Sequence, residues 1–335
     1  MNSPPRYKAL KNAAGYLLAA ACLVWVFHDV DWKTLAGNIT AIDWRWVVLG
    51  VLFDVLSYVS QGYRWHILLK PLGRIGTLRT TQAVYSGLFL NEILPMRLGE
   101  IARGYLVSVW MSKRFVAIIP SMVLERLFEG IWMAIGIGVT AFFVPLPRNL
   151  VRAGDILGLV VLALTGIVLY LILRKKRAGD EGRPDKAVRW KLLRRLRSLL
   201  DRLEGGFRSI GLSRDFYAAF FVSLLLFALQ ASAFWFIMKA YGLPYSFWVG
   251  AAVFLIVQFG TALPNAPANI GSYQLFCVLG LTLFGVEKTV AAGFSIVVFI
   301  LLTIPLWAIG FFALGQSGMT LASIKDKIRQ LRARE

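Results

Sequence analysis

Residues 81–110 read TQAVYSGLFLNEILPMRLGEIARGYLVSVW, with one apolar piece before Pro95 and another after Gly99. Each piece has ~10 to 12 residues, or ~15 to 18 Å of helix, whereas the hydrocarbon core of a bilayer is ~30 Å thick. Proline removes a backbone donor from a helix, and glycine permits a chain reversal. We therefore predict that this segment is a broken helix.

Residues 246–285 repeat this plan. An apolar piece precedes Pro264, the stretch PNAPANIGS follows over residues 264–272, and a second apolar piece begins after Gly271. Pro267 lies within the same turn. We predict a second broken-helix hairpin here, so that Pro95, Gly99, Pro264, Pro267 and Gly271 are the hairpin residues.

The composition places the whole chain in a membrane. Of 335 residues, 58% are hydrophobic and 16% are charged, yet 37 Lys and Arg outnumber 18 Asp and Glu, which gives a net charge of +19. A nucleic-acid-binding protein with that charge would carry far more polar surface, so nucleic acid is not an expected partner. No stretch has the composition of a soluble domain, and we expect a single integral membrane domain over residues 1–335.

Six further apolar segments are predicted to be full crossings. They are residues 13–27, 46–69, 115–146, 154–173, 215–240 and 288–314. The first half is then residues 1–173 with the hairpin 81–110, and the second half is residues 215–314 with the hairpin 246–285. A basic loop, 174–214, joins the halves, and residues 315–335 form a tail.

Charge decides between hairpins and interrupted crossings. If both broken segments are hairpins, most Lys and Arg lie on one side, including the 14 in the loop 174–214. The positive-inside rule makes that side cytoplasmic. We expect a multi-pass protein of a bacterial inner membrane with both termini in the cytoplasm. The fold is then all-α, with six transmembrane helices and two re-entrant hairpins in an inverted repeat, a pattern typical of transporters with a midplane site.

Nine ionisable residues remain inside the predicted membrane region. They are Asp54, Arg64, Glu92, Arg97, Glu100, Arg103, Glu125, Arg126 and Glu129. Each would cost at least ~2.5 to 3.5 kcal/mol at a helix centre facing lipid. Five acids nearly balance four arginines, which favours pairing within a protein-lined polar cavity. Asp54 and Arg64 lie ten positions apart in one helix and cannot pair directly.

We predict that the cavity binds a lipid head group. Arg97 and Arg103 would hold an anionic group, because the planar guanidinium can hold two phosphate oxygens. Alternatively, these charges pair with one another and stabilise the hairpin, or Glu125 and Arg126 lie at the inner interface. The predicted substrate-binding residues are Arg97, Glu100, Arg103, Glu125, Arg126, Glu129, Asp54, Asn91, Asn265, Asn269, Tyr273 and Gln274.

The second hairpin contributes only neutral groups to this set. Asn265, Asn269, Tyr273 and Gln274, with Ser272 beside them, could hydrogen-bond the head group from the opposite side. They could equally cap the ends of the broken helix, since Asn and Ser are preferred caps.

Three strings carry a resemblance: NEILPMRLGEIARGY at 91–105, ERLFEG at 125–130 and PNAPANIGSYQ at 264–274. Together they resemble the lysylphosphatidylglycerol synthase transmembrane family, the flippase-like part of bacterial multiple-peptide-resistance proteins. The resemblance implies lipid movement. By resemblance, residues 95–103 match the family's P-x-R-x-G-E-x-x-R element, Glu125 and Arg126 its E-R element, and Gly271 the glycine of its second hairpin. The family's soluble aminoacyl-transferase domain has no counterpart after the last crossing, so we expect no synthase activity.

The basic loop adds a membrane-surface element. Residues 190–207 place Trp and Leu at steps of three and four with arginines between, which predicts an amphipathic helix on anionic lipid. The simpler interpretation is a loop that only fixes the topology.

No cofactor or metal is expected. Cys22 and Cys277 lie in apolar runs, and His28 and His66 lie near the ends of such runs. Asp29 and Asp31 form a D-x-D sequence, which binds metal and nucleotide sugar only within a nucleotide-binding domain.

The leading hypothesis is a lipid flippase without an internal ATPase and without catalytic residues. Its substrate would be an anionic, aminoacylated or polyprenyl-linked lipid. The alternatives are an intramembrane transferase that acts on lipid, or a non-transporting partner of an envelope-biosynthesis complex. The lipid, the direction, the energy source and the oligomeric state stay open.

Overall fold

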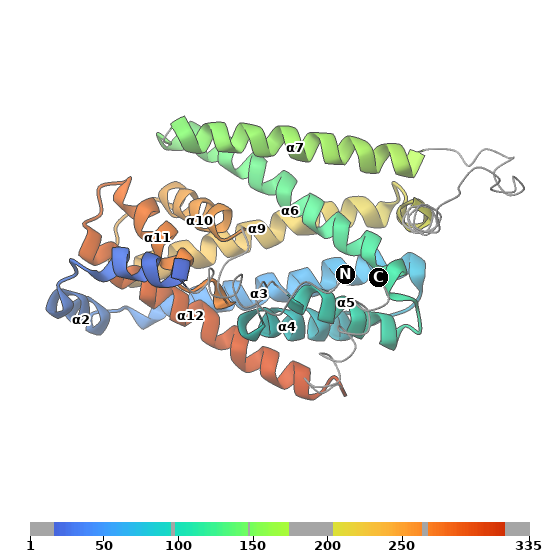
Figure 1. The fold of residues 1–335 in the computed structure, drawn as a ribbon, viewed down its shortest axis with the longest axis horizontal. Helices are drawn as coiled ribbons and strands as arrows, with labels where there is room; N and C mark the ends of the chain where they lie inside the picture. Colours follow the sequence, from blue (N-terminus) through green and yellow to red (C-terminus); the bar gives the residue numbers. More distant parts are fainter. Residues whose placement is uncertain (1–16, 95–97, 147, 174–203, 263–266, 319–335) are drawn as a thin grey trace, which may run out of the picture.

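The computed structural model describes residues 17–94, 98–146, 148–173, 204–262 and 267–318, and these are helical with no strand among them (Figure 1). Within these described ranges, five helices are long and apolar enough to cross a membrane. They are α3 (Trp44–Leu69), α6 (Phe115–Phe143), α7 (Arg148–Leu173), α9 (Arg214–Ala240) and α12 (Lys288–Gly315). These five predicted crossings are confirmed as apolar helices, although α7 begins earlier than expected.

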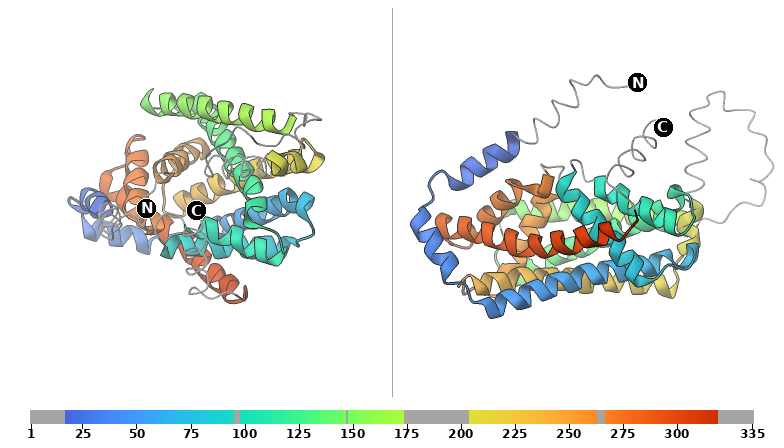
Figure 2. Two further views of the ribbon diagram at one scale, coloured as in Figure 1. Left: turned by 45° about the vertical axis from the view of Figure 1, so that its right-hand side comes forward. Right: turned by 90° about the horizontal axis from the view of Figure 1, so that it is seen from below.

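Helices α3 and α9 form an antiparallel pair that runs along the length of the bundle (Figure 2). At one end the Asp43 N–H donates to the Ala240 carbonyl over 3.0 Å. At the other end the Lys70 ammonium pairs with Asp215 at 2.7 Å. The two helices therefore run side by side over their full length. We call these two ends of the bundle the Asp43 end and the Lys70 end.

The first broken segment is a helical hairpin made of α4 (Thr77–Ile93) and α5 (Leu98–Trp110). Both arms meet at the Lys70 end, where the Arg79 guanidinium lies 5.2 Å from the centre of the Trp110 ring. The expectation of ~10 to 12 residues is wrong for α4, which has 17, because the polar turns TLRTT continue the helix beyond its apolar part. The arms touch through glycine: a Cβ on Gly99 would lie 1.9 Å from the Gly87 carbonyl oxygen.

The second broken segment is also a hairpin, made of α10 (Phe247–Thr261), the 3₁₀ turn η3 (Pro267–Asn269) and α11 (Ser272–Thr282). Its arms meet at the Asp43 end, where the Tyr245 hydroxyl donates to the Phe284 carbonyl over 3.1 Å. The hairpins therefore open at opposite ends of the bundle. Because η3 packs on α4, the turn of the second hairpin meets the first hairpin inside the molecule.

Two shorter helices lie toward the Asp43 end. One is α2 (Trp32–Thr40), with Asp31 as its N-cap; no helix was predicted there. The Thr34 hydroxyl donates to Asp31 and holds the pKa of that carboxyl below its ordinary value. Of the predicted crossing 13–27, the described part is the helix Leu17–Phe27, shorter than a full span.

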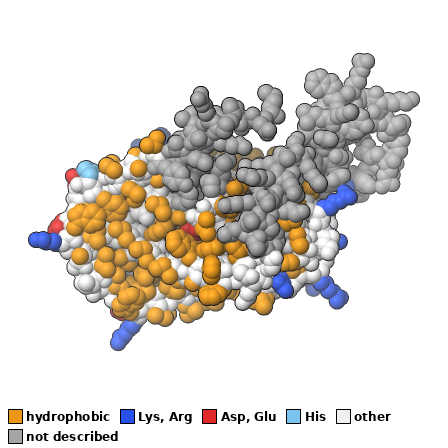
Figure 3. All heavy atoms as spheres, turned by 60° about the horizontal axis from the view of Figure 1, so that its bottom comes forward, with side chains coloured by type: hydrophobic (Ala, Val, Ile, Leu, Met, Phe, Trp, Pro, Cys, Tyr) orange, Lys and Arg blue, Asp and Glu red, His pale blue; other side chains and the backbone are white. Residues whose placement is uncertain are grey.

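The sides of the bundle are apolar. Figure 3 shows hydrophobic side chains over the middle of one face, with Lys and Arg toward its periphery. Helix α7 packs on α6 and exposes much of its own surface, including 68% of Leu159. The long helices thus present to their surroundings the kind of surface that a bilayer accommodates.

The predicted surface helix 190–207 lies mostly outside the described residues, as does most of the tail 315–335. The last residues of the predicted surface helix, 204–207, belong to a described helical turn, in which Phe207 is buried in one apolar cluster with Ile67 and Leu68. This end of the segment packs on the bundle.

We expect Gly99→Ala to lower the thermal unfolding midpoint in detergent. The new methyl group would clash with backbone atoms of α4, and overpacking costs about 1 to 3 kcal/mol. The matched control is Gly138→Ala in α6, where nothing lies within 4 Å of an added Cβ. Replacing a helical glycine there should leave stability unchanged or raise it by about 0.5 to 1 kcal/mol. Equal behaviour of the two variants would contradict the close hairpin.

Candidate functional site

Six of the nine predicted intramembrane charges gather in one cluster. They come from three helices: Arg64 from α3, Glu100 and Arg103 from α5, and Glu125, Arg126 and Glu129 from α6. The spacings of three and four residues place the members from one helix on one face. The first hairpin brings this face of α5 against α6, and Arg103 reaches Trp65 of α3.

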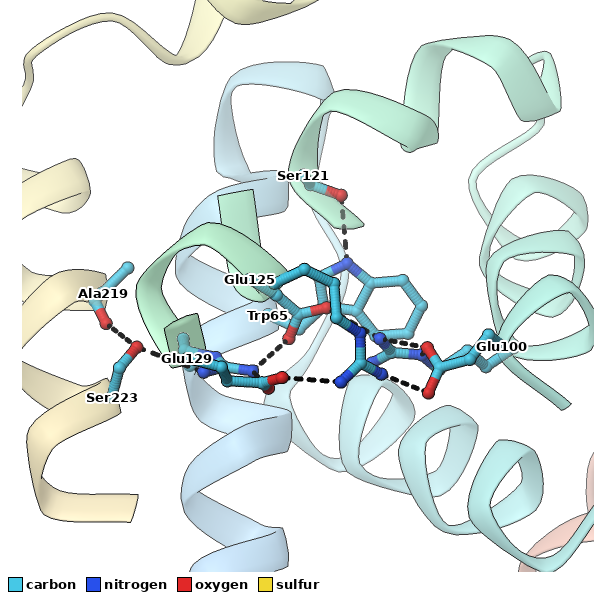
Figure 4. A network of polar contacts seen from close by, with 10 residues as sticks. Trp65, Glu100, Ser121, Glu125, Glu129, Ala219 and Ser223 are labelled. Atoms are coloured by element: carbon cyan, nitrogen blue, oxygen red, sulfur yellow. Dashed lines mark hydrogen bonds and ion pairs between the residues drawn. The ribbon is translucent and has the colours of Figure 1, made fainter. Parts of the chain in front are cut away.

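The cluster is a closed ring in which every glutamate pairs with two arginines and every arginine with two glutamates (Figure 4). In order around the ring the pairs are Arg64–Glu125 at 3.1 Å, Glu125–Arg103 at 3.1 Å, Arg103–Glu100 at 2.7 Å, Glu100–Arg126, Arg126–Glu129 at 2.6 Å and Glu129–Arg64 at 2.6 Å. Three positive and three negative charges cancel. We call these six residues the charge ring.

Other side chains support the buried part of the ring. The side chains of Arg64 and Glu125 are fully buried, and Arg64 also donates to Ser223 of α9 over 3.1 Å. The Arg103 guanidinium lies 4.7 Å from the centre of the Trp65 ring, a cation–π contact. The Trp65 indole in turn donates to Ser121 over 3.0 Å. The ring thus joins α5 to α6 and α6 to α3.

This arrangement bears on the predicted substrate-binding residues. Glu100, Arg103, Glu125, Arg126 and Glu129 pair with one another, which is the alternative that the sequence left open. Arg126 is the most accessible member, with 47% of its side chain exposed. Arg64 also belongs to the ring but was not among the predicted site residues, because its partners on α6 lie more than 60 positions away in the sequence.

A separate polar cavity lies between the two halves of the chain, with a volume of about 140 Å³. Its walls come from α3, α4, α9, α10, η3, α11 and α12. The lining residues are Asp54, Tyr58, Glu92, Gln230, Phe234, Phe254, Gln258, Ala268, Asn269, Tyr273, Phe299, Leu302, Thr303 and Leu306. We call this the central cavity. None of its described lining residues is Lys or Arg.

The central cavity contains three predicted site residues, Asp54, Asn269 and Tyr273. It also contains polar residues that were not in the predicted substrate-binding set: Gln230, Gln258, Tyr58, Thr303 and Glu92. Glu92 accepts a long hydrogen bond of 3.4 Å from the Trp307 indole. The sequence contains one signal for Gln230 and Gln258: each is an amide in an apolar helix, and such a group needs a hydrogen-bonding partner or water.

Other predicted residues serve the hairpins themselves. Gln274 accepts from the Gly271 N–H over 2.8 Å, and the Ser272 hydroxyl donates to the Asn269 carbonyl over 2.9 Å. Both side chains therefore supply hydrogen-bond partners to backbone groups at the break in the helix. Gly271 has φ of +87°, a conformation that favours glycine. Asn91 faces α5, and its side-chain oxygen lies 2.6 Å from where a Cβ on Gly99 would stand.

Several predicted residues lie outside the described part of the chain. They are Pro95, Arg97, Pro264 and Asn265, together with the side chain of Pro267. Their assignments as anion-binding and hairpin residues stay predictions.

The acids of the D-x-D sequence have local partners. Asp31 accepts from the Lys33 N–H and the Thr34 hydroxyl, and Asp29 pairs with His28 at 2.5 Å. Within the described ranges, no group of three His, Cys, Asp or Glu side chains is placed to hold a metal ion.

The family model for the lysylphosphatidylglycerol synthase TM region matches residues 12–310, which includes the charge ring and both hairpins. The chain belongs to this family. A UPF0104 membrane protein of Methanothermobacter thermautotrophicus is 22% identical over 344 residues, covering 96% of this chain and 97% of the relative. Another from Methanocaldococcus jannaschii is 23% identical over 299 residues, covering 84% and 86%. Neither name indicates a catalytic activity.

We expect Glu125→Gln to destabilise the protein strongly. The change leaves Arg64 and Arg103 each without one buried partner, and breaking a buried pair costs about 3 to 5 kcal/mol. The unfolding midpoint in detergent should fall well below that of the wild type.

The control is Asp215→Asn, which breaks the half-exposed pair with Lys70 and should cost at most about 1 kcal/mol. Similar small losses in both variants would mean that the charge ring does not hold α5 in place.

Proposed function

We propose that this protein moves the polar head group of a membrane lipid between leaflets through the central cavity. The observation that carries the proposal is a polar cavity lined from both halves of the chain, inside a bundle with an apolar exterior. A head group cannot cross hydrocarbon without losing its hydrogen bonds to water. Amide, hydroxyl and carboxyl groups in the central cavity would replace those bonds.

The depth of the cavity supports this role. Asp54 lies ten residues after the start of α3, which is ~15 Å of helix and about half the thickness of a bilayer core. Ala19 of the first apolar helix lies beside Gly271, at the turn of the second hairpin. At the Asp43 end, the Lys288 ammonium lies 4.8 Å from the Trp25 ring. The described residues 17–27 thus extend from the hairpin turn to that end, as expected for half of a sixth crossing.

We infer an inverted repeat of two four-helix units. The first unit is α3, the hairpin α4–α5 and α6, and the second is α9, the hairpin α10–α11 and α12. The antiparallel pairing of α3 with α9 and the opposite openings of the hairpins support this inference. Inverted repeats with broken helices are typical of transporters in which one unit rocks against the other around a midplane site.

The partner is then a membrane lipid of the anionic, aminoacylated or polyprenyl-linked class, in a bacterial inner membrane. Arg97 is the predicted ligand for a phosphate in such a head group. The described cavity walls offer carboxyl and neutral groups, which suit the hydroxyl or ammonium parts of a head group.

We expect the Lys70 end to face the cytoplasm, because Lys70, Arg74, Lys113 and Arg114 lie around it. Cysteine introduced as Ala36→Cys in α2 should react with a membrane-impermeant maleimide on intact cells. Cysteine introduced as Lys113→Cys, between α5 and α6, should react only after the membrane is opened. The reverse pattern would contradict the topology.

Narrowing the cavity should slow lipid movement. Thr303 lines the cavity from α12, whereas Ile304 beside it is 56% exposed on the outside of the bundle. In proteoliposomes with NBD-labelled phosphatidylglycerol, phosphatidylethanolamine or polyprenyl phosphate, the wild type should speed exchange between leaflets for at least one lipid. Thr303→Phe should slow that exchange about tenfold or more, a barrier increase of about 1.4 kcal/mol, and Ile304→Phe should not.

Equal rates for Thr303→Phe and Ile304→Phe would contradict the route through the central cavity. Chemical turnover of an added lipid or sugar donor by the purified protein, without lipid exchange, would favour a transferase instead.

A further inference from the structure

The acids inside the bundle fall into two groups. Each glutamate of the charge ring pairs with two arginines. Asp54 is only 5% exposed, and its Oδ2 atom has no hydrogen-bond partner among the described residues. Asp54 lines the central cavity. Among the described residues, Asp54 is therefore a buried carboxyl that faces a polar space and has no cation beside it.

The described groups around Asp54 carry no positive charge. In this part of the chain the titratable groups that face Asp54 are Tyr58 of α3, Tyr85 and Glu92 of α4, and Tyr273 of α11. Glu92 is itself acidic and would repel a second negative charge. The other walls contribute neutral Gln230 of α9, Gln258 of α10, Asn269 of η3 and Thr303 of α12.

The charge ring is too far away to compensate Asp54. Arg64 lies ten residues further along α3, which is ~15 Å of helix. Its guanidinium is already held by Glu125, Glu129 and Ser223. A charged Asp54 in the closed cavity would thus bear the full free-energy cost of leaving water. Binding a proton would neutralise the carboxylate and remove that cost.

We propose that Asp54 takes up and releases one proton in each transport cycle, so that lipid movement is coupled to a proton gradient. The inference rests on the proposed function. When the cavity opens to one side, a hydronium ion transfers its proton to the Asp54 carboxylate, an O–H bond forms, and water is left. The Asp54 side chain stays protonated and neutral while the cavity is closed to both sides. When the cavity opens to the other side, water takes the proton and the carboxylate returns.

The mechanism gives the cavity two roles. The amides and hydroxyls hold the head group, and the charge state of Asp54 determines whether the two units can change position. Because walls from both units surround Asp54, rocking of one unit against the other would change its access to water.

The test uses the full chain in proteoliposomes with the labelled lipid that the wild type moves. The wild-type rate should depend on pH, by up to about tenfold per pH unit as expected for one titrating group. Imposing a proton gradient should drive net lipid movement. Asp54→Asn, which carries a permanently neutral side chain, should lose both responses. Asp155→Asn in the exposed part of α7 should keep them.

A second readout covers the case in which Asp54→Asn does not move lipid. Infrared difference spectra of the wild type between alkaline and acidic pH should contain the carbonyl stretch of a newly protonated carboxylic acid. This band should be missing from Asp54→Asn and present in Asp155→Asn.

Two results would overturn the proposal: a pH-independent wild-type rate, or an infrared band that survives in Asp54→Asn. Dependence of the rate on Na⁺ rather than on pH would also overturn it, in favour of a metal cation at Asp54. Absence of lipid movement by the wild type, with the infrared band intact, would instead count against the proposed function.

Discussion

The free-energy cost of a charge inside a bilayer governs this structure. Six charged side chains from α3, α5 and α6 are tolerated because they form a neutral ring in which each has two partners of opposite sign. A single unpaired member would cost several kcal/mol. The ring therefore specifies where α5 must lie against α6, and α4, the other arm of the first hairpin, packs on α3.

The position of the second hairpin is set by its packing on the first. The turn η3 lies on α4, and the arms of the two hairpins open at opposite ends. Neutral polar groups from α9, α10 and η3 then face Asp54 and Glu92 across the central cavity. The charge ring and the central cavity thus occupy different places: the ring lies toward the Lys70 end, and the cavity lies near the middle of the bundle.

The amino-acid sequence predicts much of this fold for clear physical reasons. Proline and glycine mark both hairpins, and apolar length marks the five long helices. The short helix α2 and the true length of α4 were missed because both depend on capping and on polar turns outside apolar runs. At the site, spacing identified the acids and arginines of α5 and α6, but not Arg64 as their partner. That pairing joins residues more than 60 positions apart, and no local pattern encodes it. Gln230 and Gln258 were missed because each is a single amide in an apolar helix, without a repeating pattern.

The chain belongs to the lysylphosphatidylglycerol synthase TM family. The proposed lipid transport requires a polar route for the head group, separate from the lipid tails, and the central cavity is our candidate for that route. The central claim is that a lipid head group occupies the central cavity. Native mass spectrometry of the protein after mild extraction tests this claim most directly. We predict a retained lipid on the wild type and on Ile304→Phe, and its loss from Thr303→Phe. Equal retention by all three proteins would contradict the claim.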